Sequence, residues 1–524
     1  MEYGWLTIVP PLVAITLALL TKQVIISLLI GILSGSFILA NFSPVGAISL
    51  SAMTMWENVT DPWNVAILVF LVTLGILTYL MVIAGGAAAY GEWATKRIKS
   101  RAGAQLASLL LGIIIFIDDY FNCLTVGTVM IPVTDRFRVS RAKLAYIIDS
   151  TAAPVCVLAP VSSWVVTIMS TMGDKFRDVG ITVEPFTAFI KTLPMNLYAW
   201  ATLVMVAFVA VTELDFGPMG RFEREAKATG DVYGPRASEG KVKLPKISKK
   251  GTVPDLVVPV IGLIGFAIVM MAYTGGYFVE NIGFLDAIKN TDAATALMYA
   301  GFLALALALV MFLSRGIISV GRLPEAAWQG FLSMVPAMLI LCFAWTIGGI
   351  INQLGTGLFL ATRVGQALNP VLYPVIMFIL SCIIAFATGT SWGTFAIMIP
   401  IAVDFAVLLA PNLLIGMIGA VLAGAVYGDH CSPISDTTIL SSTGAGCNHI
   451  DHVSTQLPYA TVSAVMCGIG YIVYGFMAQS GVSTAVTIAV SFLVTLGLLA
   501  IVLKGLNALT SGSEFKIGSR RRVA

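Results

Sequence analysis

Two short polar stretches interrupt apolar sequence and carry the residues best suited to chemistry. They are residues 428–438, GDHCSPISDTT, and residues 149–154, DSTAAP. Each places a carboxylate, hydroxyl groups and a proline inside a segment that is otherwise apolar. An ionisable group at membrane depth costs about 3 kcal/mol or more, so it predicts a functional site. Proline and small residues there predict a broken helix, whose freed backbone groups can face an ion.

Two more polar interruptions lie in apolar stretches that are too long for one membrane crossing of about 20 residues. The stretches are 104–137, interrupted at 118–122, and 370–410, interrupted at 388–391. Each predicts a re-entrant helical hairpin with its polar turn at the tip. If both tips and both broken helices meet near the midplane, the candidate cation- or substrate-binding residues are Asp118, Asp119, Asn122, Thr125, Asp149, Ser150, Thr151, Thr388, Thr390, Ser391, Asp429, Ser432, Asp436 and Thr437.

These side chains suit a hard cation such as sodium, which prefers carboxylate, hydroxyl and carbonyl oxygens. Five intramembrane carboxylates with no Lys or Arg nearby in the sequence cannot all stay ionised without a counter-ion. Such a site can take up either a proton or a metal ion, which is the exchange that an antiporter needs. The candidate proton carriers are Asp149, Asp429, Asp436 and His430.

Each candidate also has a structural interpretation. Asp118 and Asp119 would then sit at a water-exposed turn, and Asp149 and Asp429 would cap half-helices. Asp436 would bond to neighbouring backbone, and His430 would serve helix packing rather than proton transfer. A further group, His449, Asp451 and His452, resembles a metal cluster but is expected to lie in a solvated loop.

The composition places these residues in a membrane protein. The chain has 524 residues, of which 58% are hydrophobic and 11% are charged, whereas soluble domains carry about 25% charged residues. Many apolar runs near 20 residues predict an all-α polytopic fold of about eleven transmembrane helices plus two hairpins. There is no Walker A motif and no paired metal spacing among the seven cysteines, and we expect no cleavable signal because residues 1–4, MEYG, lack a basic region. We therefore expect neither an enzyme nor a resident cofactor, and no nucleic-acid partner.

The chain also repeats internally. Gly127-Thr128 and Pro132 match Gly393-Thr394 and Pro400, and Asp149 matches Asp429, in the same order. An odd number of full crossings in the first half makes the repeat inverted. The predicted units are a first repeat 1–213 with a broken helix at 143–172, a basic linker 214–254, a second repeat 255–478 with a broken helix at 412–441, and a final helix and tail 479–524.

The placement of Lys and Arg supports this topology. Between residues 216 and 253 there are nine Lys or Arg and four Asp or Glu, which predicts a cytoplasmic linker. With the N-terminus outside, the basic tail is cytoplasmic too, and the loops 43–62 and 173–191 lie outside. The alternative, two full crossings in each long stretch, predicts parallel repeats and puts some basic loops outside.

The stretch GDHCSPISDTT resembles the NhaC family of sodium/proton antiporters, and DSTAAPV at 149–155 is similar to that family as well. The resemblance implies inverted repeats, hairpins, elevator-like movement and a homodimer in a cell inner membrane. Some members exchange organic acids, so the resemblance favours cation coupling more than any one substrate.

The sequence therefore predicts a sodium/proton antiporter with a midplane cation site and alternating access. The main alternative is a sodium- or proton-coupled carrier of a small organic solute. A carboxylate-rich site without Lys or Arg disfavours an anionic solute. Carboxylates in broken helices favour alternating access over an open channel, and no nucleophile, base and orienting group are recognisable by their spacing.

Overall fold

The computed structural model describes residues 3–520 except 22, 235–246, 281, 357–358, 360–367 and 434. This part of the chain is helical and contains no β-strand. Ten of its helices are long and apolar enough to cross a membrane, or eleven if the bent pair α2 and α3 counts as one span. The predicted all-α polytopic fold is thereby confirmed.

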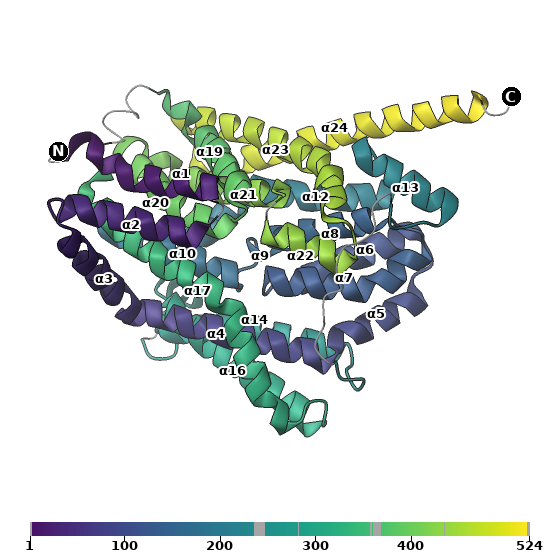
Figure 1. Ribbon diagram of the computed structural model, residues 1–524, viewed down its shortest axis with the longest axis horizontal. Helices are drawn as coiled ribbons and strands as arrows, with labels where there is room; N and C mark the ends of the chain where they lie inside the picture. Colours follow the sequence, from purple (N-terminus) through teal and green to yellow (C-terminus); the bar gives the residue numbers. More distant parts are fainter. Residues whose placement is uncertain are drawn as a thin grey trace.

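The first half of the chain supplies thirteen of the α-helices described (Figure 1). Prolines stand at the first position of α3, α4 and α11, where the missing N–H costs nothing. The bounds are α1 Val9–Thr21, α2 Val24–Leu39, α3 Pro44–Thr60, α4 Pro62–Ala84, α5 Gly86–Arg97, α6 Arg101–Ile114, α7 Asp119–Arg136, α8 Arg141–Thr151, α9 Ala153–Cys156, α10 Ser163–Val179, α11 Pro185–Thr192, α12 Leu197–Thr212 and α13 Gly217–Thr229.

The second half follows a similar order of long and interrupted helices. The bounds are α14 Pro254–Thr274, α15 Phe284–Lys289, α16 Ala293–Ser314, α17 Leu323–Leu354, α19 Tyr373–Thr388, α20 Ser391–Leu409, α21 Leu414–Cys431, α22 Asp436–Ala445, α23 His449–Gln479 and α24 Thr484–Arg520. Short 3₁₀ turns precede α1, α12, α17, α19 and α21. Helix α24 extends past the rest of the molecule toward the C-terminus (Figure 1).

Both long apolar stretches fold as helical hairpins. Arg136, at the end of α7, donates to the Thr95 carbonyl (2.8 Å), and Arg101, at the start of α6, pairs with Glu223. Glu223 also accepts from the Ser140 N–H (2.8 Å), so α6 starts at the end of the molecule where α7 finishes. In the second pair, the rings of Tyr373 and Phe405 bring the start of α19 to the end of α20 (5.9 Å).

Both predicted broken helices are broken where the polar stretches lie. The first stops at Thr151, continues as the short α9 and resumes at Ser163. The second stops at Cys431 and resumes at Asp436. After each break, the second half-helix packs on the other half of the chain: α10 on α20, and α22 on α7 and α8. The contact between the Ser150 hydroxyl and the His430 ring (3.3 Å) brings the two breaks together.

Three segments are more helical than the sequence indicated. The stretch 43–62, predicted as a loop, forms α3, which is capped by Ser43 and turns back from α2 by 118°. Its exposed Val45, Ile48 and Trp56 give it an apolar face. In the stretch 173–191, α10 continues to Val179 and α11 follows. The linker 214–254 contains α13, while its residues 235–246 lie outside the described part.

Candidate functional site

Asp429 lies at the end of α21, where the second broken helix stops, and its carboxylate is surrounded by hydroxyl groups. One carboxylate oxygen accepts from both the backbone N–H (3.1 Å) and the hydroxyl (2.8 Å) of Ser391. The other accepts from the Ser435 hydroxyl (2.6 Å), which also contacts the Thr437 hydroxyl (2.9 Å). Asp429 is buried, so these donors replace its hydration. The cluster joins the tip of the second hairpin to the second helix break.

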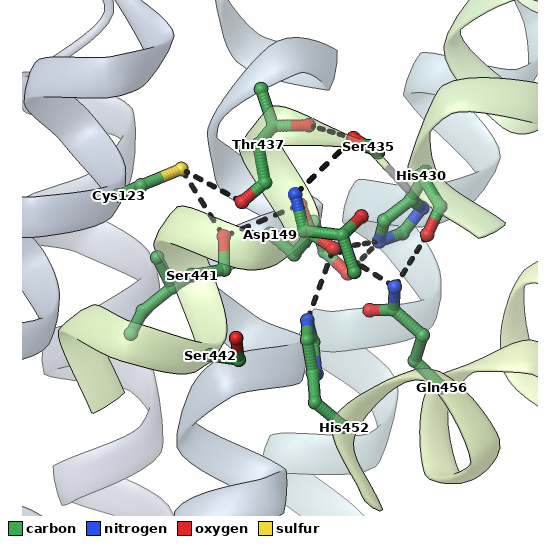
Figure 2. A network of polar contacts seen from close by, with 12 residues as sticks. Cys123, Asp149, His430, Ser435, Thr437, Ser441, Ser442, His452 and Gln456 are labelled. Atoms are coloured by element: carbon green, nitrogen blue, oxygen red, sulfur yellow. Dashed lines mark hydrogen bonds and ion pairs between the residues drawn. The ribbon is translucent and has the colours of Figure 1, made fainter. Parts of the chain in front are cut away.

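Asp149 lies in α8, near the end of the first half-helix, and has different partners. One oxygen accepts from the Ser441 hydroxyl of α22 (3.3 Å). The other contacts the His452 Nε2 atom (3.1 Å) and accepts from the Gln456 side-chain amide (2.8 Å), both on α23. Figure 2 shows the carboxylate between Ser441 on one side and His452 and Gln456 on the other. All four residues are buried.

His430 lies between the two carboxylates in the chain of contacts. It follows Asp429 directly, and its Nε2 atom is 4.0 Å from Asp149 and 3.3 Å from the Ser150 hydroxyl. Its Nδ1 atom contacts the Tyr198 hydroxyl (2.7 Å), and its ring stacks on Tyr146. The ring is fully buried and held from four sides, so its position relative to Asp149 is set by packing.

The first hairpin contributes a third acidic cluster. Asp118, in the break before α7, accepts from the hydroxyl of Ser163, the first residue of α10 (3.3 Å). Asp119 begins α7 and is buried beside it, and Thr125 is buried two turns further along. The water-exposed turn considered for Asp118 and Asp119 is therefore wrong.

Several predicted ligands use their polar groups on backbone instead. Asn122 donates to the Gly112, Ile115 and Thr151 carbonyls (2.7, 2.9 and 3.0 Å), and so joins the first hairpin to the first break. Ser432 donates to the Phe386 carbonyl (2.6 Å) and does the same in the second half. The hydroxyls of Thr151 and Thr388 bond within their own helices, and Thr390 is buried at the start of α20.

Asp436 begins α22, but its side chain lies outside the described residues. Thr437, one residue later, accepts from the Cys123 thiol through its carbonyl (3.7 Å). Cys123 also contacts Ser441 (3.1 Å), so the first hairpin lies against the partners of both Asp429 and Asp149 (Figure 2).

Sequence reasoning missed the residues that complete the clusters. His452 was expected in a solvated loop, but α23 begins at His449 and buries His452 completely. The spacing of His452 and Gln456, four residues apart, was the available signal, because such residues share a helix face. Ser435, Ser441 and Ser163 had no signal beyond their position beside the helix breaks.

The arrangement separates two kinds of chemistry. The partners of Asp429 described above are hydroxyls and an N–H, and hydroxyl oxygens can turn their lone pairs to a hard cation. The partners of Asp149 include the His452 imidazole, which suits proton transfer, and the Gln456 amide, which donates a hydrogen bond to the carboxylate. Within the described residues, no three His, Cys, Asp or Glu side chains are grouped to hold a transition metal.

Comparisons with known proteins match the chain to a family model and to bacterial relatives. The family model described as the Na+/H+ antiporter family matches residues 155–476. A Haemophilus influenzae protein, described as an uncharacterized protein, is 43% identical over 498 residues, which cover 93% of this chain and 94% of that protein.

Two partial relatives have more specific names. An uncharacterized Na+/H+ antiporter of Haemophilus influenzae is 33% identical over 151 residues, 29% of this chain and 32% of that one. The malate-2H+/Na+-lactate antiporter of Bacillus subtilis is 30% identical over 200 residues, 35% of this chain and 41% of that one.

Proposed function

The chain belongs to the Na+/H+ antiporter family, and from that premise we propose that it is a secondary transporter that exchanges sodium ions for protons. The observation that carries this proposal is the pair of buried carboxylates at two helix breaks, Asp149 and Asp429, linked through His430. Burial of an ionisable group in a membrane protein is costly, which favours a functional role for both carboxylates.

We assign sodium to the Asp429 cluster. The carboxylate, the hydroxyls of Ser391, Ser435 and Thr437, and the carbonyls freed at the break offer the oxygen set that a hard cation prefers. Helix α20 begins at Ser391, and the positive end of its dipole points at the Asp429 carboxylate. This favours the ionised form of Asp429, which binds sodium. Asp118 and Ser163 are the equivalent candidates at the start of α10.

We assign the proton to Asp149 and its imidazole partner. His452 Nε2 contacts the carboxylate, so a proton can move between the two groups without a change in packing. His430 contacts Asp149 and follows Asp429 in the chain, so a cation taken up at Asp429 and a proton taken up at Asp149 disfavour each other by electrostatic repulsion. That repulsion couples the release of one cation to the binding of the other.

The membrane arrangement is part of the proposal. The hairpins, the breaks and the reciprocal packing of α10 and α22 support inverted repeats with re-entrant hairpins. Arg101, Lys143, Glu223 and Asp215 link α6 and α8 to the region of α13, which supports a linker on the cytoplasmic side. A cell inner membrane, an outside N-terminus, elevator-like movement and a homodimer stay predictions from the sequence.

A second candidate function is the exchange of an organic solute coupled to sodium or protons. It is favoured by the similarity to the malate-2H+/Na+-lactate antiporter, which reaches over 35% of this chain. In this reading the two clusters would bind the coupling ions, and a solute would have to occupy a site beside them.

The test is the purified protein in liposomes, with a sodium gradient as the driving force and internal pH as the readout. Sodium alone should drive protons in the opposite direction. Sodium binding to the solubilised protein should also weaken steadily as the pH falls, with unchanged capacity, because protonation and sodium binding exclude each other.

Two results would contradict the antiporter proposal: no sodium-driven proton flux, or a sodium affinity that is independent of pH. If proton flux appears only when malate, lactate or another organic acid is added, the second candidate is the correct one.

A further inference from the structure

The two half-helices that begin at the acidic clusters run side by side away from them. Helix α10 begins at Ser163, which bonds to Asp118, and α20 begins at Ser391, which bonds to Asp429. Next to these starts, the Trp164 ring lies 5.4 Å from the Trp392 ring. Since the two helices start together and remain in contact, their interface leads from the acidic clusters to one end of the molecule.

A buried ion pair closes the far end of this interface. Lys175 of α10 and Asp404 of α20 are 2.7 Å apart, with side chains only 5% and 9% exposed. At 1.5 Å per residue, Lys175 lies about 18 Å along α10 from Ser163. The Lys175 amine also contacts the Asn352 side chain of α17 (3.5 Å). The pair therefore joins three helices at a single point.

A polar cavity lies directly against this pair. It measures about 140 Å³, and its lining includes Asn58, Thr171, Asp174, Lys175, Trp345 and Pro400. Lys175 belongs both to the cavity wall and to the ion pair, and Pro400 lies one turn before Asp404 on α20. The cavity is large enough for several water molecules. Water or a hydrated ion in it would be separated from the acidic clusters by the α10–α20 interface.

The Lys175–Asp404 pair is not expected to add much to the free energy of folding. Burying two charges costs free energy that their attraction often only balances, and well-packed apolar residues stabilise a protein as well or better. A charged pair between two segments is, however, suited to a two-state contact, because each charge can be rehydrated when the segments separate. The cavity beside Lys175 and Asp404 provides room for the water molecules that would hydrate the separated charges.

We propose that the α10–α20 interface is the outer gate of the transport path and that the Lys175–Asp404 pair is its latch. The Trp164, Trp392 and Phe395 rings form the inner layer of the gate, next to the acidic clusters. Separation of α10 from α20 breaks the pair and connects the cavity to Asp118 and Asp429. The inference rests on the proposed function for the existence of a transport path, and on the predicted outside N-terminus for the side on which this gate lies.

The experiment measures access rather than transport, so it can fail independently of the proposed function. A single cysteine replaces Thr167, which is 2% exposed and lies two turns closer to the acidic clusters than Lys175. The background lacks the seven native cysteines. A membrane-impermeant thiol reagent is applied to right-side-out or inside-out vesicles, and the labelling rate is recorded.

In the variant Lys175→Met with Asp404→Leu, which leaves no unpaired charge, labelling from the outside should be about tenfold faster, because the closed state loses the contact that favours it. The exchanged pair, Lys175→Asp with Asp404→Lys, should restore the slow rate. The control is Lys227→Met in α13, since Lys227 is 43% exposed and pairs with Glu213 away from α10, α20 and the cavity. It should label at the parent rate.

An unchanged labelling rate in the Met/Leu variant would overturn the proposal, as would faster labelling from the inside only. A lower melting temperature of the solubilised Met/Leu variant without faster labelling would make the pair structural, which also overturns it.

Discussion

Asp149 and Asp429 take corresponding places in the two halves of the chain, yet their surroundings differ. Asp429 receives its hydrogen bonds from Ser391 and Ser435, which belong to its own half. Asp149 receives them from Ser441, His452 and Gln456, which all belong to the other half. The same carboxylate beside the same kind of helix break thus has hydroxyl partners in one case and an imidazole partner in the other.

The difference shows that the partners of a buried carboxylate are not set by the helix break beside it. The break itself is encoded locally and is similar in both halves. The chemistry of each carboxylate comes from the elements packed against it, and these differ because α23 brings His452 to Asp149. A cation site and a proton site can therefore arise from one repeated device, and the contrast between them can be tested.

The largest effect should come from neutralising the two carboxylates. Asp429→Asn and Asp149→Asn should each lower sodium/proton exchange about 100-fold or more, in the range that proton-transfer groups contribute. They should differ in binding: Asp429→Asn loses sodium binding, whereas Asp149→Asn retains it but loses its pH dependence. Calorimetry or ²²Na binding on the solubilised variants across a pH series separates the two outcomes.

The matched control is Asp292→Asn. Asp292 is exposed and caps α16 through Thr295, and Asn caps helices equally well. It should leave flux and folding unchanged. Normal flux in either Asp149→Asn or Asp429→Asn would show that this residue is not part of the mechanism. Loss of sodium binding in Asp149→Asn would contradict the assignment of sodium to Asp429 and of the proton to Asp149.

A smaller effect is expected from the imidazole at Asp149. In His452→Gln the side-chain amide can still donate to the carboxylate, but it cannot carry a proton. Exchange should fall about tenfold, which is less than the full contribution of a general acid–base group, and the pH dependence of the rate should flatten while sodium affinity stays normal. Flux measured in liposomes from pH 6 to about 9 is the readout.

His449→Gln provides the comparison on the same helix. His449 contacts the Pro433 carbonyl through Nε2 (2.7 Å), a contact that the Gln amide can reproduce. This variant should keep the parent pH profile. If both variants flatten the profile equally, the effect belongs to α23 as a whole and not to the Asp149 contact.

The smallest effect should distinguish single hydroxyls. Ser435→Ala removes a donor 2.6 Å from Asp429, and a hydrogen bond to a charged group contributes about 1.5–3 kcal/mol, so sodium affinity should fall about tenfold. Ser441→Ala removes a longer contact, 3.3 Å from Asp149, and should leave sodium affinity within about twofold. Equal losses of sodium affinity in both variants would mean that the two carboxylates form one site.

Much of the fold could be predicted because membrane burial restricts the chain so strongly. The apolar runs predicted most spanning helices, and the polar interruptions predicted both hairpins and both breaks. The helical loop α3 could not be predicted by hydropathy, because its residues alternate between apolar and polar over only 17 positions. Its N-terminal Ser43-Pro44 was the local signal.

The candidate site could be predicted only in part. The carboxylates at 118, 119, 149 and 429 stood out because charged residues are rare in apolar helices. Asn122, Ser432 and Thr151 stood out as polar residues in the same stretches, yet their side chains bond to backbone carbonyls. Nothing in the local sequence separates a hydroxyl that satisfies a carbonyl from one that faces a carboxylate.

The sequence by itself determined where the helices break and that a carboxylate stands at each break, since both follow from local composition and the cost of burying charge. Only the tertiary structure decided which partners each carboxylate has. His452 lies 303 positions from Asp149 in the chain, and Lys175 lies far from Asp404, so no local pattern could pair them. Their contacts exist because α23 packs on α8 and α10 packs on α20, so that helices from the two halves of the chain lie against each other.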